Sequence, residues 1–448
     1  MKLWEEDFSG KLRKEVSEFT AGDDVLLDQH LVHYDVIGSI AHATMLQKIG
    51  VLTKDELDKL RKSMKHILKL NAEKKFKLSV DDEDVHTKVE LHLTRELGEI
   101  GKKIHTARSR NDQIILDTRL YTKDRMLEVE EELLSLCAAL IAFSRKSDIP
   151  MPGYTHLQKA MPSSVALWAL AYAESLLDDL DLLKAAYALN DQCPLGSAAG
   201  YGVPVAIDRQ MTASLLGFGK VQNNVLYVQN SRGKIESVVL GALSQVMLDL
   251  TKMANDVILF STDEFGFFEI PEEYCTGSSI MPKKRNPDIL ELIRARSNKV
   301  FAYYHQTIGI IKDLPSGYNR DFQETKEPLI KGLETTKSCL QMATMLMKDL
   351  KVNKEKLMKS FTPEIFAADK AFELVSRGVP FRDAYKEVEY NFIALEKSNP
   401  DRTIRTRKHL GAPGNLGIDK VEKWLQKEQS SLQQERSRFA SRVQALVA

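Results

Sequence analysis

Apolar residues recur every three or four positions over long stretches of the chain. From Met126 to Arg145 they form one broad stripe, as helical periodicity requires. The same spacing predicts further helices over 163–189, 234–260, 287–314 and 327–350, and a charged amphipathic helix over 419–447. Strand-like alternation is nearly absent, with Asn223–Gln229 the one short candidate. The pattern therefore predicts an all-α protein.

The predicted helices are much longer than the ordinary mean of about 11–12 residues. Helices of this length bury more than one face, against neighbours in a bundle or against other subunits. A monomeric bundle remains open, and an oligomeric bundle is favoured. A change in composition at Phe361-Thr362-Pro363 marks a smaller C-terminal domain, so we expect three domains, at 1–107, 108–358 and 359–448.

Composition narrows the class of protein. Lys+Arg and Asp+Glu balance at 63 each, so charge indicates neither nucleic acid nor an anionic membrane as a partner. No run of about 18 apolar residues predicts a membrane span, and the charged opening does not resemble a signal peptide. The four cysteines include no Cys-x-x-Cys pair and read as reduced thiols of a cytoplasmic protein.

The loop from Thr276 to Asp288 has the strongest chemical signal. Gly277 precedes the paired serines Ser278 and Ser279, and cationic side chains follow at 283–285. Asn286 is a candidate helix N-cap, and the proline after it suits a first helical position. Backbone N–H groups at a helix start, together with lysines, suit a carboxylate or a phosphate. A mobile basic loop with an ordinary cap is an equal alternative.

Three other segments carry polar groups between helices. Gly153–Gln158 places the Thr155 hydroxyl beside His156, whose imidazole suits proton transfer near neutral pH. The segment 105–113 has arginines on both sides of Ser109, a pattern that favours carboxylate recognition. Tyr318–Lys326 is dense in hydrogen-bonding groups. A structural histidine and a solvated helix cap remain the alternatives for the first two.

Other well-known catalytic and cofactor-binding motifs are absent from the sequence. The sequence contains no Gly-x-Gly-x-x-Gly before a strand, no P-loop and no Gly-x-Ser-x-Gly elbow. His30 and His33, like His86 and His92, lack the spacing and partners of a zinc site. We therefore expect no metal and no organic cofactor.

Taken in order, the motifs resemble the fumarase/aspartase superfamily. Its Ser-Ser-x-Met-Pro-x-Lys-x-Asn loop is matched by Ser278, Ser279, Met281, Pro282, Lys284 and Asn286. The stretches 105–113, 153–158 and 318–323 look like the argininosuccinate lyase family within it, and 35–42 and 82–87 extend the match. The resemblance covers about residues 25–395.

This resemblance implies a homotetramer in which long helices complete a twenty-helix core and three subunits form each active site. The implied reaction is the reversible β-elimination of argininosuccinate to fumarate and L-arginine, in arginine biosynthesis and without a cofactor. A related carbon–nitrogen lyase for another N-succinyl or amino-polycarboxylate compound, or an inactive structural homologue, remains an alternative.

The resemblance also implies roles for individual residues. Ser278 would be the general base, assisted by Lys284, and His156 the general acid or part of a relay, with Glu291 as its carboxylate partner. The succinyl carboxylates would meet Ser109, Asn111, Thr155, Lys284 and Asn286, and the arginine half Tyr318, Gln323 and Lys326. Arg110 would be either a carboxylate clamp or a structural support.

Several positions depart from the family pattern. Trp4-Glu5-Glu6-Asp7-Phe8 replaces a Trp-Gly-Gly-Arg-Phe opening, and Asp24 stands where a substrate-contacting serine is usual. Because an acid repels a dicarboxylate, Asp24 bears on the amine half of the substrate. Further departures are Arg320, Thr325, Tyr385 and the segment 230–234.

Overall fold

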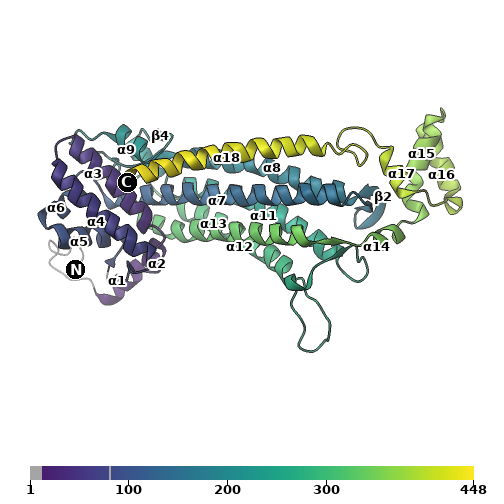
Figure 1. Ribbon diagram of the computed structural model, residues 1–448, viewed down its shortest axis with the longest axis horizontal. Coiled ribbons are helices and arrows are strands. Elements are labelled where there is room, and N and C mark those ends of the chain that lie inside the picture. The colour runs from purple at the N-terminus through teal and green to yellow at the C-terminus, as the bar shows by residue number, and fades with distance from the viewer. Residues whose placement is uncertain (1–12, 80–81) are drawn as a thin grey trace.

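The computed structural model describes residues 13–79 and 82–448, so the altered opening at 4–8 lies outside the described residues. The molecule is elongated (Figure 1), with a helical cluster at one end, long helices in the middle and a small helical part at the other end. The prediction of an all-α fold is confirmed, because the only strands form three two-stranded sheets among the described residues.

The central bundle consists of five long helices lying side by side (Figure 1). They are α7 (Arg110–Lys146), α8 (Val165–Asn190), α11 (Lys234–Phe260), α12 (Asp288–Ile311) and α13 (Lys326–Asp349). α11 packs against α8, α12 and α13, while α7 packs against α8 and α13. All five predicted helices are present, and the bounds of four differ from prediction by only a few residues.

Helix α7 is the exception, because it begins at Arg110 rather than at Met126. Ser109 caps it, and a capping box with Asp112 fixes its start. The helical turns before Met126, which the apolar pattern did not predict, carry buried charged residues. These residues interrupt the apolar periodicity. Arg119 donates to the Ser231 hydroxyl, and Lys123 pairs with the Asp191 carboxylate.

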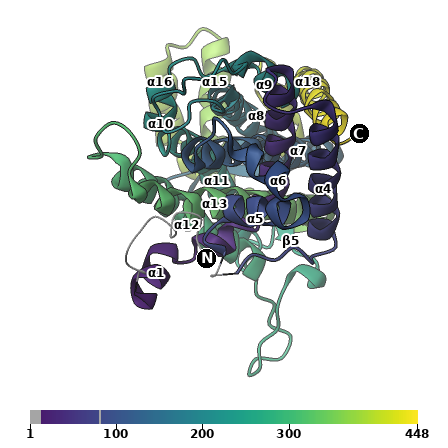
Figure 2. The ribbon, with the colours of Figure 1, turned by 90° about the vertical axis from the view of Figure 1, so that its left-hand side faces the viewer.

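The cluster at the N-terminal end covers the start of α7, and Figure 2 views the molecule from this end. Its elements are α1 (Lys14–Ala21), α2 (Asp24–Asp28), α3 (Val32–Lys48), α4 (Lys54–Ala72), α5 (Val85–Leu97), α6 (Glu99–Lys102) and the 3-10 turn η2 (Lys103–His105). α3 packs against both α4 and α7, which joins this cluster to the bundle.

A short hairpin connects α7 to α8. Strand β1 (Pro150–Thr155) pairs antiparallel with β2 (Gln158–Ser164), leaving His156 and Leu157 as the two-residue turn. Both turn residues have positive φ, 54° and 59°, which matches the type I′ geometry of tight hairpins. The sequence did not predict this hairpin, because neither turn residue is the glycine or asparagine that usually marks such a turn.

The connection from α8 to α11 contains β3 (Gln192–Cys193), α9 (Arg209–Leu215), β4 (Lys220–Val221) and α10 (Val225–Asn230). The prediction of a strand at Asn223–Gln229 is therefore wrong. The Asn224 side chain accepts a hydrogen bond from the Tyr227 N–H and starts a helix instead. Strand β5 (Phe268–Glu269), which pairs with β6 (Lys351–Val352), and η3 (Glu272–Tyr274) follow α11; η4 (Arg320–Thr325) leads into α13.

The small part at the far end holds α14 (Lys354–Lys359), η5 (Pro363–Phe366), α15 (Ala367–Ser376), α16 (Phe381–Tyr390), η6 (Phe392–Ala394) and α17 (Pro400–Arg405). Helix α18 (Ile418–Val447) then runs back along the bundle and contacts α7, α8 and α3 (Figure 1).

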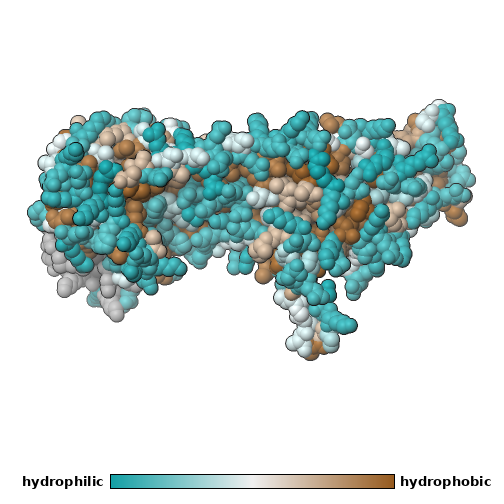
Figure 3. All heavy atoms as spheres, in the orientation of Figure 1, coloured by the Kyte–Doolittle hydropathy of each residue, from teal (hydrophilic) through white to brown (hydrophobic). Residues whose placement is uncertain are grey.

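The surface of the long helices is partly apolar (Figure 3). Exposed apolar side chains on these helices include Leu182, Leu189, Leu248, Leu292 and Met345. Among the described helices, α11 has the length and apolar composition of a membrane span. Its packing against three bundle helices accounts for that composition as a core helix.

Candidate active site

A cavity of about 430 Å³ lies at the N-terminal end of the bundle. It is formed by α2, the start of α5, the start of α7 and the segment that leads into α13. Six of the predicted substrate-binding residues line it: Ser109, Arg110, Asn111, Tyr318, Gln323 and Lys326. Two segments separated by about 200 residues in sequence thus meet at one cavity.

The first turn of α7 is fixed by hydrogen bonds around Ser109. Its Oγ accepts from the Asn111 N–H at 3.2 Å, and its own N–H donates to Asp112 at 3.0 Å. Asp112 is fully buried and also accepts from the N–H groups of Gly196 and Ala198. Burial raises the pKa of Asp112 to about 6, against the lowering effect of these N–H donors. The first turn is therefore held by the loop after α8.

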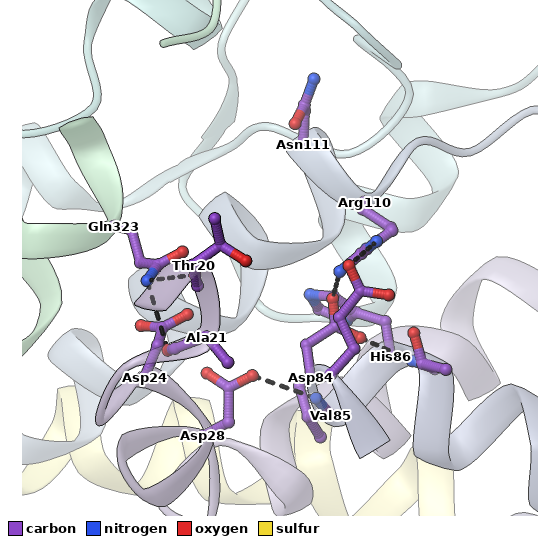
Figure 4. Close-up of polar contacts among 12 residues, drawn as sticks. Thr20, Ala21, Asp24, Asp28, Asp84, Val85, His86, Arg110, Asn111 and Gln323 are labelled. Carbon is purple, nitrogen blue, oxygen red and sulfur yellow. Dashed lines mark hydrogen bonds and ion pairs between the residues drawn. The ribbon is translucent and has the colours of Figure 1, made fainter. Parts of the chain in front are cut away.

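Arg110 is held by acids of the neighbouring segment rather than left free. Its guanidinium pairs with Glu83 at 3.0 Å. It also pairs with Asp84, the N-cap of α5 (Figure 4). Burial lowers the pKa of Arg110, but Asp84 and Glu83 outweigh burial and the net shift is upward. Of the two roles expected for Arg110, these ion pairs favour structural support.

Lys326 lies between two acids of α2. Its Nζ is 2.7 Å from Asp24 Oδ1 and also binds Asp28 Oδ1, while the lysine side chain is only 3% exposed. Burial lowers the pKa of Lys326, but Asp28 and Asp24 raise it further, so the ammonium stays charged. The unusual acid at position 24 is thus the partner of a predicted substrate-binding lysine.

Gln323 and Arg320 connect η4 to the end of α1. The Gln323 amide donates to the carbonyls of Thr20 and Ala21 (Figure 4), and Arg320 also donates to the Thr20 carbonyl. Tyr318 is 42% exposed, and the Arg232 guanidinium lies 5.7 Å from its ring centre.

His86 is a cavity residue without a predicted role. Its Nδ1 lies 2.8 Å from Asp35 Oδ1 and 3.5 Å from Asp117 Oδ2, and the residue is 5% exposed. Burial lowers the pKa of His86, but Asp35 and Asp84 raise it above the ordinary value. Its one sequence signal was membership of the 82–87 motif.

The serine loop lies elsewhere, between η3 and α12. The Ser278 hydroxyl accepts hydrogen bonds from the N–H groups of Ile280, at 3.3 Å, and Met281, at 3.0 Å. Lys284 is exposed in the same loop, and Lys283 has a φ of 65°. Two N–H donors directed at one oxygen stabilise negative charge on it.

The base of this loop is closed by backbone pairing between Thr276 and Asn286. The prediction that Asn286 caps the next helix is wrong, because Pro287 holds the N-cap position and no side chain caps α12. The Asn286 backbone is used for this pairing instead. Glu291 lies one turn into α12 and is exposed in a shallow groove with Asp288 and Arg294.

Thr155 and His156 lie at the exposed end of the β1–β2 hairpin, far from the cavity. Helix α7 has 37 residues and is about 55 Å long at 1.5 Å per residue. Ser109 precedes its first residue, and the hairpin follows its last (Figure 1). Within one chain the candidate residues therefore occupy three separate places: the cavity, the serine loop and the hairpin turn.

Two groups of side chains among the described residues are close enough to share a metal ion. One is Asp35, His86 and Asp117, and the other is His66, His92 and Glu96. The expectation that His86 and His92 lack partners is therefore wrong in three dimensions. In the first group, the 2.8 Å bond from His86 Nδ1 to Asp35 Oδ1 already uses the ring nitrogen that faces both acids. The second lies away from the cavity, between α4 and α5.

Known proteins resemble this chain over almost its whole length. A family model described as "Lyase" matches residues 10–302. Argininosuccinate lyase of Phocaeicola vulgatus is 46% identical over 422 residues, covering 94% of each chain. The Thermotoga neapolitana protein of the same name is 44% identical, covering 86% of this chain and 97% of its own. The chain belongs to the argininosuccinate lyase family.

Solved structures of more distant proteins share the fold of this argininosuccinate lyase family member. EDDS lyase in complex with formate has a TM-score of 0.82 at 22% identity, covering 98% of this chain and 95% of its own. Class II fumarase from Schistosoma mansoni has a TM-score of 0.72 at 16% identity, covering 88% and 95%. The fumarase-type fold predicted from the motifs is confirmed.

Proposed function

We propose that this protein cleaves argininosuccinate to fumarate and L-arginine by β-elimination, and that it serves arginine biosynthesis in the cytoplasm. The observation that carries the proposal is 46% identity, over 94% of both chains, to a protein named argininosuccinate lyase. The cavity supports it, since Ser109 and Asn111 lie in the same cavity as Lys326 and Gln323. The reaction needs no metal and no organic cofactor.

In the proposed mechanism, Ser278 removes the proton next to a carboxylate of the succinyl half. A serine needs help to act as a base, and the Ile280 and Met281 N–H groups already point at its oxygen. Lys284 adds a positive charge to the same loop. The succinyl carboxylates, one of which gains charge, would be held by Ser109, Asn111, Thr155, Lys284 and Asn286.

The leaving nitrogen of arginine takes up a proton as the carbon–nitrogen bond breaks. We propose His156 as this acid, or as part of a relay to it, with Glu291 orienting its ring. Tyr318, Gln323 and Lys326 would hold the arginine half, with Arg110 supporting the cavity wall through Glu83 and Asp84.

Each active site would combine the cavity of one subunit, the serine loop of a second and the hairpin turn of a third. The separation of about 55 Å along α7 supports this assembly, since one chain cannot bring Ser109 and His156 together. A homotetramer would cover the apolar side chains of the long helices. We propose the domain division 1–107, 108–358 and 359–448, with α18 returning to the bundle.

The first test is the absorbance of fumarate formed from argininosuccinate by the purified protein and by Ser278→Ala. We expect fumarate from the wild type and a kcat about 10²–10⁴-fold lower in the variant, the usual contribution of a general base. Ser279→Ala, the neighbouring exposed serine, serves as the control and should lose far less. Full activity in Ser278→Ala would refute the assignment of the base.

The shared site is tested by mixing two inactive variants, Asn111→Ala in the cavity and Ser278→Ala in the loop. After joint unfolding and refolding, hybrid tetramers contain some sites in which every contributing segment is wild type. Activity should therefore return in the mixture and in neither parent refolded alone. A mixture as inactive as its parents would show that each chain completes its own site.

A further inference from the structure

A cluster of three side chains that can bind a metal ion lies between α4 and α5, at the N-terminal end of the molecule (Figure 1). His66 belongs to α4, and His92 and Glu96 belong to α5. Each offers one nitrogen or oxygen atom, and these atoms all lie within 4.8 Å of one another. Of the described residues that line the active-site cavity, none belongs to this cluster. The proposed reaction therefore leaves the three side chains without a role.

His92 and Glu96 are one helical turn apart and lie on the same face of α5. His92 Nε2 is 3.5 Å from Glu96 Oε2. Two ligand atoms of a tetrahedral zinc ion are about 3.3 Å apart, because each lies about 2.0–2.1 Å from the metal. This pair of side chains therefore has almost the spacing that a zinc ion requires.

The Nε2 atom of His92 is available to a metal ion. It is buried and has no hydrogen-bond partner among the described residues. A buried polar atom without a partner is uncommon in a native protein, and a bound ion or water is the usual explanation. The Phe76 ring packs edge-on against the imidazole, with 5.9 Å between the ring centres, and so holds the nitrogen in place.

The Glu96 carboxylate is held by a group on the other helix. The hydroxyl of Ser63, a residue that is 1% exposed, donates a hydrogen bond to Glu96 Oε2. A carboxylate oxygen has two lone pairs, so this bond leaves acceptor capacity for a metal ion. Hydrogen bonds of this kind orient the ligands of known metal sites. Ser63 lies one turn before His66, so α4 provides one ligand and orients another.

His66 completes the cluster from an exposed position on α4. Its ring centre is 6.1 Å from that of His92. Since no two ligand atoms are more than 4.8 Å apart, closure to about 3.3 Å requires a movement of about 1.5 Å at most. Rotation of an exposed side chain between its staggered conformers provides a movement of this size.

The three donors favour one class of metal. Two imidazoles and one carboxylate are a common set of zinc ligands, with water at the fourth position. Magnesium and calcium prefer sets made of oxygen atoms, so the two imidazoles disfavour them. The charges of Arg95 and Lys88 act on His92 against a cation. Arg95 is exposed to solvent, which screens its charge, and Lys88 is paired with Asp82 at 2.7 Å.

We propose that His66, His92 and Glu96 bind one zinc ion, with a water molecule as the fourth ligand. The ion joins α4 to α5, because its ligands come from both helices. His86, at the start of α5, lines the active-site cavity, so the ion stabilises a helix that forms part of the cavity wall. It is a structural ion and takes no part in the proposed reaction.

The experiment is a calorimetric titration of the untagged, full-length protein with zinc chloride, in a buffer that does not bind metals. His66→Gln removes an exposed ligand and so leaves the fold intact. His409→Gln is the matched control, since His409 is an exposed histidine outside both groups of candidate metal ligands. The visible spectrum of bound Co²⁺, which differs between tetrahedral and octahedral coordination, provides a second readout.

Loss of a group that orients a metal ligand weakens metal binding by about 10–100-fold. We therefore expect Ser63→Ala to weaken Zn²⁺ binding by about 10-fold. His66→Gln removes a ligand itself and should weaken binding by about 100-fold or more, while His409→Gln binds as wild type does. Zn²⁺ should also raise the unfolding temperature of the wild type and not that of His66→Gln, because only the folded wild type presents all three ligands. Magnesium chloride should have neither effect.

Equal Zn²⁺ binding by the wild type and His66→Gln would overturn the proposal, because the ion would then occupy another site. A wild type that binds no Zn²⁺, or that binds Co²⁺ with an octahedral spectrum, would overturn it as well. None of these readouts uses the release of fumarate, so the outcome is independent of the proposed function.

Discussion

The cavity and the serine loop are built in opposite ways. In the cavity, Lys326 and Arg110 are each held by two acids of a neighbouring segment. In the loop, Lys284 is exposed, and the Ser278 hydroxyl contacts only N–H groups of its own loop among the described residues. The cavity is lined by segments of one chain, whereas most side chains of the loop are exposed.

This difference separates charges that contribute to folding from charges that contribute to catalysis. A charge buried among partners contributes to folding, because its removal leaves those partners uncompensated. A charge on an exposed loop contributes little to folding and gains its effect where a substrate or another subunit encloses it. Substitution of a lysine by methionine in each region tests this separation directly.

Lys326→Met should give the largest effect, a destabilisation of about 3–5 kcal/mol, because Asp24 and Asp28 would lose their shared cation. The measurement is urea unfolding at fixed protein concentration. Lys331→Met, one turn further along α13, removes an exposed pair with Glu327 and should cost less than about 1 kcal/mol. Equal costs for the two variants would contradict a structural role for the buried cluster.

Lys284→Met should leave the unfolding midpoint unchanged and lower kcat by about 10²–10³-fold, the effect of losing one donor to developing charge. Lys283→Met is the control, since Lys283 is the adjacent exposed lysine. The unfolding midpoint and kcat of each variant together distinguish a catalytic role of Lys284 from a structural one. A stability loss without a kinetic loss would show that Lys284 supports the loop fold instead.

The sequence predicted the bundle because long apolar stripes need only local periodicity to be recognised. It failed where a charged side chain is buried with a distant partner, as at the start of α7, where Lys123 meets Asp191. It also failed at the His156 turn, since a positive φ in a non-glycine residue leaves no signal in composition. Both failures depend on contacts that are not local in sequence.

The candidate site was predicted at the level of segments rather than of contacts. The family resemblance proposed Ser109, Asn111, Gln323 and Lys326 as substrate-binding residues, and these four residues line one cavity. Asp24 stood out as a departure, but its role was hidden because its partner lies about 300 residues away. No periodicity or spacing reveals such a pair, and only the packing of α2 against the start of α13 does.

In the cavity, buried acids keep their charge because each is paired with a cation. Within the described part of the chain, Glu130 on α7 is a buried acid without such a partner, so its pKa shows what burial does alone. Glu130 is 5% exposed and forms no ion pair among the described residues. Burial raises its pKa from 4.5 to about 8. Asp84, also buried, pairs with Arg110, and although burial acts upward, His86 and Arg110 bring the pKa of Asp84 below its ordinary value.

The sign of the pH effect follows from these shifts. The unfolded chain ionises Glu130 near pH 4.5, while the folded protein keeps the proton up to about pH 8. Stability is therefore lost as the pH rises through this window. In Glu130→Gln, the fall in unfolding free energy between pH 5 and pH 8 should be smaller than in wild type by about 2–4 kcal/mol. Glu131→Gln, at the adjacent exposed position, should keep the wild-type fall. If Glu130→Gln also kept the wild-type fall, Glu130 would not be the group that takes up the proton. The contrast with the paired acids of the cavity would then be contradicted.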